Sequence, residues 1–336
     1  MNAAKRSFLI IAFALILAGG FLFLYALSRV GFDVKKLGSE PYGTEEISLT
    51  EPFSSVNAKL LDCSLTLADA PDGQTRAVVT SSKDAPVTLK TESGALVISQ
   101  GDGRPWYRRI GFFDFGGASV VLYLSAGETL DLRAETASGD VCCNVTYPFG
   151  TADVTTVSGE ISWNVASAAE MNLKTTSGDI EIRNSAVRRG ITINSTSGEV
   201  TLDTCETEST LYIRTTSGDI ELRGVTAAEP LTVKTVSGKI KTDRVSVGNV
   251  GTLESTSGDM LLGDVTFSDT CHIKTTSGDV HFLRACAKDF RVETVSGDVS
   301  GSVIGEAAEH RGSGARQGKG WSVSTVSGYV HIYPAE

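Results

Sequence analysis

Residues 171–182 read M-N-L-K-T-T-S-G-D-I-E-I, and this stretch returns along the chain with a nearly constant period. Its [ST]-x-S-G core places a serine at steps of 19 or 20 residues, namely at Ser138, Ser158, Ser177, Ser197, Ser217, Ser237, Ser257, Ser277 and Ser296. Two outlying copies stand at Ser93 and Ser327, displaced by insertions. A period this regular is typical of a stacked repeat array, in which each unit covers its neighbour and none folds alone.

Apolar and polar residues alternate on both sides of the S-G pair. With the serine as position 0, positions −6, −4, +3 and +5 are apolar in most units, as at Met171, Leu173, Ile180 and Ile182. Such alternation indicates a strand with one buried face. Each unit is therefore predicted to be strand, turn, strand and a looser return, such as Gly224–Pro230. The glycine is expected to supply a backbone angle that other residues resist.

Position −2 is Thr or Ser in all copies and lies on the inward side. Its hydroxyl is expected to bond to backbone at the corner or to the next unit, so burial need not cost stability. A solenoid, which pairs equivalent strands of successive units in parallel, is favoured over an array of hairpins because identical columns then stack on themselves. Because parallel crossovers are nearly always right-handed, we predict an all-β, right-handed parallel β-helix. Rungs about 4.8 Å apart would give the nine regular copies a length on the order of 40 Å.

The run of I-x-x-T-T-S-G-D-I-x-[IL] units resembles the bacterial DUF4097 family, β-strand-repeat proteins regarded as proposed adhesins. The segment Phe53–Ser99, with L-x-D-C-S-L-T-L followed by V-T-L-K-T-E-S-G-A-L-V-I, is similar to the beginning of that family's domain. The resemblance covers roughly residue 44 to the end. It implies a β-helical extracytoplasmic domain, often membrane-anchored and sometimes found in cell-envelope stress operons. It implies no catalytic residue and no cofactor.

The first forty residues differ from the repeat. Phe8–Leu27 is twenty residues without a charge, long enough at about 1.5 Å per residue to cross a hydrocarbon core. We expect an uncleaved signal-anchor, with residues 1–7 cytoplasmic, 8–27 transmembrane, 28–43 a tether, and 44–336 an extracytoplasmic solenoid with insertions at 101–117 and 301–320. Basic residues flank the segment on both sides, so the charge rule for orientation nearly cancels.

Charge and cysteine usage limit the partners. A net charge of −10 argues against nucleic acid, which selects basic surfaces. Of the six cysteines, Cys143, Cys205 and Cys271 fall in inward columns and are expected to act as small core hydrophobes. Because they lie on different rungs and no C-x-x-C spacing exists, neither disulfides nor a zinc or redox site is predicted. Cys142 is expected to face outward.

An acidic column at position +2 is the most regular charged feature. It reads Asp140, Glu160, Asp179, Glu199, Asp219, Lys239, Asp259, Asp279 and Asp298. One interpretation is a row of weak calcium sites, but calcium needs six to eight oxygens and the repeat lacks the G-G-x-G-x-D pattern of calcium-binding solenoids. The favoured interpretation is that the aspartates cap turn amides. No metal site is therefore predicted.

The two insertions carry the remaining candidates. The first contains aromatic and arginine side chains of the kind found in binding hot spots and at membrane interfaces, namely Trp106, Tyr107, Arg108, Arg109, Phe112 and Phe113. The alternative is that this loop covers the N-terminal end of the array, because such arrays need caps. The second insertion, 301–320, is rich in Gly, Ala and Ser and is interpreted as a mobile surface loop.

Catalysis has little support in the sequence. The four histidines are scattered, and the S-G-D triplets have no histidine beside them as a base. We therefore expect a non-catalytic binding or structural module of the bacterial cell envelope, without cofactors, whose partner is a wall polymer, a surface ligand or a membrane protein. The alternatives are a regulatory partner of an envelope-stress sensing system and, far behind, a carbohydrate-active enzyme, because fold alone does not transfer activity.

Overall fold

Residue-by-residue register between strands defines the architecture of this chain. The computed structural model describes residues 19–21, 24, 25, 28, 42–101, 103, 117–125, 127, 129–303, 310–312, 316–318, 321–327 and 330–334. Over these ranges, no helix has both the length and the apolar character needed to cross a membrane. The predicted anchor at 8–27 lies almost wholly outside them.

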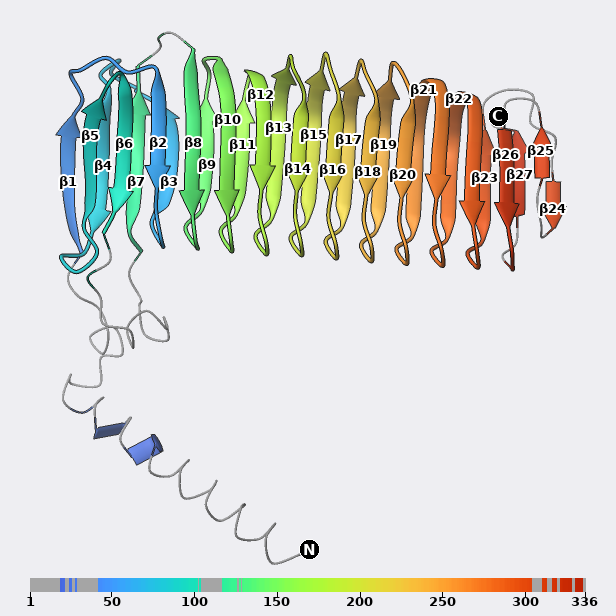
Figure 1. The fold of residues 1–336 in the computed structure, drawn as a ribbon, viewed down its shortest axis with the longest axis horizontal. Coiled ribbons are helices and arrows are strands. Elements are labelled where there is room, and N and C mark those ends of the chain that lie inside the picture. Colours follow the sequence, from blue (N-terminus) through green and yellow to red (C-terminus); the bar gives the residue numbers. More distant parts are fainter. Residues whose placement is uncertain are drawn as a thin grey trace, which may run out of the picture.

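Two ladders of strands run along the molecule, as Figure 1 shows. In spatial order, the first contains β1 (Gly43–Ser48), β4 (Arg76–Ser81), β7 (Ser119–Leu124), β3 (Ser64–Asp69), β9 (Val141–Val145), β11 (Ile161–Val165), β13 (Ile180–Val187), β15 (Val200–Thr207), β17 (Ile220–Ala227), β19 (Ile240–Val247), the first parts of β21 (Met260–Lys274) and β22 (Val280–Thr294), β23 (Val299–Val303), β27 (Val330–Pro334) and β24 (His310–Gly312).

The second ladder lies beside the first and follows the same order along the chain. It contains β5 (Val87–Glu92), β6 (Ala95–Gln100), β2 (Ser55–Lys59), β8 (Leu130–Thr136), β10 (Phe149–Thr156), β12 (Ser167–Lys174), β14 (Ile191–Asn194), β16 (Leu211–Arg214), β18 (Leu231–Lys234), β20 (Gly251–Glu254), the last parts of β21 and β22, β26 (Trp321–Thr325) and β25 (Arg316–Gly318).

Pairing within both ladders is parallel through the repeats, with each residue beside its equivalent one unit away. Ile180 pairs with Val200, which pairs with Ile220. The apolar columns at −6, −4, +3 and +5 are therefore stacked into one continuous core, and Met171, Leu173, Ile180 and Ile182 are each 1% exposed or less. The predicted parallel β-solenoid is confirmed, and the hairpin array is excluded. The right-handed sense of the coil stays a prediction.

The return segment is more regular than predicted. Strand β17 continues through the expected looser stretch as far as Ala227, and its residues pair with β15 and β19. The chain bends at position +7, where Asn184, Thr204, Gly224, Arg244, Asp264 and Arg284 all have a positive φ of 49–59°. The rungs from Ser177 to Ser277 therefore each have a third short paired run, entered through a left-handed residue.

The S-G glycines have a different role from the one expected. None of those from Gly139 to Gly297 is among the residues with positive φ. Instead, each lies against the rung before it. A Cβ added at Gly218 would lie well inside 3.0 Å of the carbonyl oxygen of Gly198, and the same holds from Gly159 to Gly297. The expectation of a special backbone angle is therefore wrong for this column, where glycine is required by close backbone approach.

The threonine or serine at −2 closes each corner as predicted. Its buried hydroxyl accepts a hydrogen bond from the amide of the glycine three residues on, at 2.8–3.0 Å, in every unit from Thr136 to Thr294. The inward amide is thereby satisfied without interrupting the apolar columns.

Antiparallel strands finish both ends of the array. At the N-terminal end, β1 pairs with β4, β4 with β7, and β5 with β6. The outlying Ser93–Gly94 pair is the turn of the β5–β6 hairpin, with φ of 52° and 78°, rather than a rung corner. At the other end, β24 and β25 of the second insertion pair with β27 and β26. The description of that insertion as a mobile loop is therefore wrong for its described parts, which extend the terminal rung.

Candidate functional site

The predicted aromatic site cannot be placed. Trp106, Tyr107, Arg108, Arg109, Phe112 and Phe113 all lie outside the described residues. The choice between a binding loop and a cap therefore stays a prediction. The described segments β1 and β4–β6, however, already cover the N-terminal end.

The acidic column is structural. The carboxylate of Asp219 accepts a hydrogen bond from the Lys239 amide at 2.8 Å, and four further aspartates, Asp140, Asp179, Asp259 and Asp279, bond in the same way to the rung that follows, at 2.8–3.1 Å. Among the described residues, the longer glutamates of the column make no such bond. This is the amide-capping arrangement predicted, and no described group of three or more His, Cys, Asp or Glu side chains could hold a metal ion.

Other charges pair along the outer faces. Glu221 is bonded to Arg223 on its own rung and to Lys241 on the next, with its Oε1 2.7 Å from the lysine Nζ. Burial raises the pKa of Glu221, but these two cations outweigh it and hold the pKa below its usual value. Lys234 and Glu254 form a similar cross-rung pair at 2.9 Å. These pairs link neighbouring rungs.

Four of the six cysteines lie in the core, among them the three expected there. All six are free thiols, and Cys143, Cys205 and Cys271 are buried. Burial raises the pKa of the Cys205 thiol to about 11 and that of Cys271 well above its usual value, which makes both poor nucleophiles. Cys142 lies on the outward face but is only partly exposed.

One histidine contacts a hydroxyl on the neighbouring rung. His281 Nδ1 lies 2.9 Å from Ser300 Oγ, and Ser300 in turn pairs in register with His331. The pair stands on the half-exposed outer surface of β22 and β23, whereas a catalytic hydroxyl and base need a third group that orients the base and a site where substrate is held.

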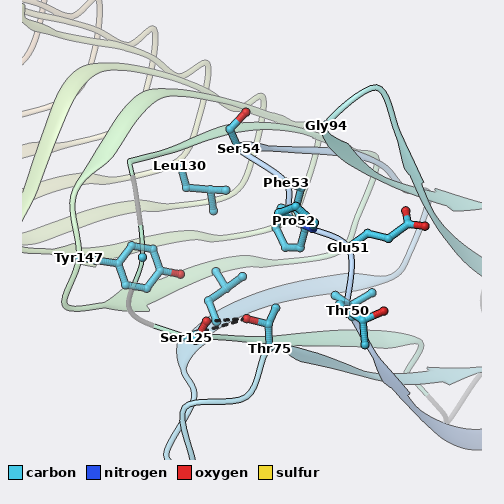
Figure 2. A pocket seen from close by; sticks show the side chains of 13 residues that line it. Thr50, Glu51, Pro52, Phe53, Ser54, Thr75, Gly94, Ser125, Leu130 and Tyr147 are labelled. Atoms are coloured by element: carbon cyan, nitrogen blue, oxygen red, sulfur yellow. Dashed lines mark hydrogen bonds between the residues drawn. The ribbon is translucent and has the colours of Figure 1, made fainter.

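A cavity at the N-terminal end is the strongest candidate for a binding site. Its volume is about 620 Å³, within the range of small-molecule sites. One wall is the crossing segment 49–54 between β1 and β2, and the opposite wall comes from the connections that follow β7 and β9 (Figure 2). Its lining includes the apolar side chains of Leu49, Pro52, Phe53, Leu124, Leu130 and Tyr147.

Tyr147 is the unusual member of this lining. It is 8% exposed, and its hydroxyl is buried without a hydrogen-bond partner. Figure 2 shows the hydroxyl directed from the far wall toward Pro52 and Phe53. Burial raises the pKa of this phenol far above its usual value, so it is a neutral group at any physiological pH.

An aromatic row fixes the position of Tyr147. Its ring stacks on Phe149 with centroids 6.1 Å apart, and Phe149 meets Trp163 edge-on at 5.1 Å. Phe149 and Trp163 are 1% exposed or less. The tyrosine ring is therefore supported from behind by the solenoid core.

The polar lining of the cavity is mostly satisfied or exposed. The hydroxyls of Thr75 and Ser125 bond to each other at 2.8 Å, and the Ser125 amide donates to Thr75 Oγ1. Glu51 is exposed and is the one charged side chain among the described lining residues. The site can therefore hold an apolar molecule and offers one buried hydroxyl.

Sequence reasoning missed this cavity because it followed the regular columns. In the rung after Ser138 the inward positions shift: Val145, Tyr147 and Phe149 stand at +7, +9 and +11 and are buried. The available signal was the Tyr-Pro-Phe triplet at 147–149, since no other regular unit has two aromatic residues and a proline at positions +9 to +11.

The family assignment rests on the repeat itself. The family described as Toastrack DUF4097 matches residues 59–248 and 191–313, which together span well over half of the chain. The chain belongs to the Toastrack DUF4097 family. The match confirms the resemblance seen in the T-T-S-G-D units. No curated protein matches the sequence.

Three crystal structures are similar to this Toastrack DUF4097 chain at low identity. A proposed adhesin from Bacteroides fragilis is 12% identical over 80% of this chain and 99% of its own, with a TM-score of 0.35. A proposed lipid-binding protein from Parabacteroides distasonis is 13% identical over 81% and 96%, with a TM-score of 0.40. A proposed adhesin from the same organism is 11% identical over 88% and 98%, with a TM-score of 0.39.

Proposed function

We propose that the chain is a non-catalytic, membrane-anchored, extracytoplasmic solenoid that acts as a binding and structural module of the cell envelope. The observation that carries the proposal is the use of the repeated polar groups. The threonine, serine and aspartate columns are bonded to turn amides, and many of the outer charges pair along or across rungs. Side chains that are bonded to the backbone or to one another in this way stabilise a rigid array and are not free to react with a substrate.

Membrane attachment is supported by the uncharged segment Phe8–Leu27, which is long enough to span a bilayer. Contact with an envelope polymer or a membrane protein is supported by the aromatic and basic composition of the first insertion. The described strands that flank this insertion, β6 and β7, lie at the N-terminal end of the solenoid.

Location is the first test. The half-exposed Cys142 and Cys286 are replaced by serine, and the exposed Glu208 is changed to cysteine as a reporter. A membrane-impermeant thiol reagent is then applied to intact and to lysed cells. The proposal predicts labelling before lysis, whereas labelling after lysis alone would place the solenoid inside and reject the envelope role.

The loop is tested separately with Trp106→Ala and Phe112→Ala in the full chain. If the loop binds a partner, these substitutions should lower the amount of cross-linked partner that is recovered from intact cells. The melting temperature of the protein should stay unchanged. A lowered melting temperature with unchanged recovery would instead assign these side chains to a cap. Recovery of an envelope-stress sensor would favour the regulatory alternative over polymer binding.

A further inference from the structure

The cavity behind segment 49–54 has the size, lining and polar group of a small-molecule site. We propose that it binds an uncharged molecule with an apolar body and a single hydrogen-bonding oxygen, such as an alcohol of medium chain length. This inference goes beyond the proposed function, which concerns polymers and protein partners.

The apolar body of the proposed ligand is inferred from the apolar part of the lining. Leu49, Pro52 and Phe53 supply it together with Leu124 and Leu130, which are 4% exposed, and polar groups make up nearly half of the lining surface. Burying the apolar part against a ligand removes apolar area from water on both sides, which is the main source of affinity in sites of this kind.

The hydrogen-bonding oxygen of the proposed ligand is inferred from the hydroxyl of Tyr147. A buried hydroxyl without a partner costs stability, and this one faces the cavity from a ring that Phe149 holds in place. A ligand oxygen that meets it would satisfy both groups. Of the other hydroxyls in the lining, those of Thr75 and Ser125 bond to each other, and those of Thr50 and Ser54 belong to exposed residues.

That the proposed ligand carries no charge is inferred from Glu51. It is the one charged side chain among the lining residues that the structure describes, and it carries the same sign as a carboxylate ligand. A fatty acid anion would therefore be repelled by Glu51, and no described cation in the lining would compensate the cost of burying its charge. The corresponding alcohol carries no charge and avoids both effects.

The test uses the full chain in phosphatidylcholine nanodiscs with a diazirine-bearing octanol as photoaffinity probe. Adducts are mapped by peptide mass spectrometry, and octanol and octanoate are compared as competitors at neutral pH. We expect saturable adducts on segment 49–54 and around Tyr147, displaced by octanol at a concentration about tenfold lower than by octanoate. Diffuse adducts along the solenoid, no saturation, or equal competition by the anion would each overturn the proposal.

Two variants separate the contributions. Tyr147→Phe keeps the ring and removes the unpartnered hydroxyl, so the protein should melt no lower while half-displacement by octanol needs about five- to tenfold more competitor. Glu51→Gln should improve displacement by octanoate several-fold and leave octanol unchanged. Glu45→Gln, on exposed β1 outside the cavity lining, is the matched control and should change neither. Unchanged competition in Tyr147→Phe would remove the hydroxyl from the site and contradict the proposed ligand class.

Discussion

At the scale of the residue, each rung from Ser177 to Ser277 has two corners with different requirements. At the S-G corner a side chain is excluded by the carbonyl of the rung before, and at +7 the backbone is left-handed. The +7 column holds Asn, Thr, Gly, Arg, Asp and Arg. Glycine has no Cβ, so the left-handed backbone is strained at the other five residues and not at Gly224. Left-handed backbone costs an L-residue roughly 1–2 kcal/mol, whereas glycine pays only its larger unfolded-state entropy of about 0.5–1 kcal/mol.

Exchanging residues at +7 should therefore change stability in opposite directions. Thr204→Gly is expected to raise the free energy of unfolding by about 0.5–1 kcal/mol, and Gly224→Thr on the next rung to lower it by a similar amount or more. Urea unfolding of the two variants beside the unchanged protein measures both. A loss of stability in Thr204→Gly would show that φ at this column is not the limiting strain.

A second residue-scale contrast involves two buried threonines. Thr215 accepts a hydrogen bond from the Gly218 amide at 3.0 Å, whereas the Thr242 hydroxyl is buried without a partner between Leu222 and Leu262. Thr215→Val leaves a buried amide unsatisfied and should cost about 1–3 kcal/mol, while Thr242→Val should stabilise by about 1 kcal/mol. Equal effects on the melting temperature would contradict this account of the corner.

The sequence predicted the hydroxyl at −2 and the need for glycine after Ser217, but for the glycine it suggested the wrong cause. A carbonyl from another rung is a long-range neighbour that no local pattern reports. The +7 column escaped notice because its residues share neither charge nor size. Local sequence shows that a position is restricted, and only the stacked structure shows by what.

At the scale of the element, successive turns are tied together by aspartate side chains. Asp219 bonds to the Lys239 amide, but Glu199, one methylene longer, makes no equivalent bond to the rung after it among the described residues. Asp219→Ala should therefore speed hydrogen exchange at the Lys239 amide by several-fold, and Glu199→Ala should leave the Asp219 amide unchanged. Site-resolved exchange measured by NMR distinguishes the two, and equal acceleration would mean that the carboxylates act only through charge.

Alternation in the sequence was enough to predict the strands on either side of each S-G corner, because there one face is buried over four or more residues. It did not reveal the third run, as in Val225–Ala227, where two inward residues are too few to show a period. It also missed that the short strands β24 and β25 pair on the last rung, since their glycine-rich sequence has no apolar alternation.

At the scale of the whole molecule, stability depends on register. Removing residues 201–220 joins Val200 to Glu221 and preserves every column, so this variant should stay folded with a modestly lower melting temperature. Removing 201–210 joins Val200 to Leu211 and shifts the inward positions, so the array should lose its cooperative transition. Thermal unfolding of the two deletion variants, followed by circular dichroism, compares their stability. Similar unfolding curves would mean that the stacked columns do not hold the rungs together.

The cavity depends on the fold of the whole molecule, because its walls come from segments near residues 49, 124 and 147, which are far apart in the sequence. Its existence depends on how the end strands fold over the first rungs, and the repeat pattern contains no information on that. Only the Tyr-Pro-Phe departure from the columns pointed to this rung.

The most direct test of the account is the distance between equivalent positions on separated rungs. Spin labels are placed at the exposed Thr176 with either Thr256 or Val295, four and six rungs away in the same column, after Cys142 and Cys286 are changed to serine. A single rigid parallel ladder predicts narrow distance distributions centred near roughly 19 Å and 29 Å, at about 4.8 Å per rung. Broad distributions, or a separation that does not grow with the number of rungs, would contradict a rigid solenoid and with it the proposed binding module.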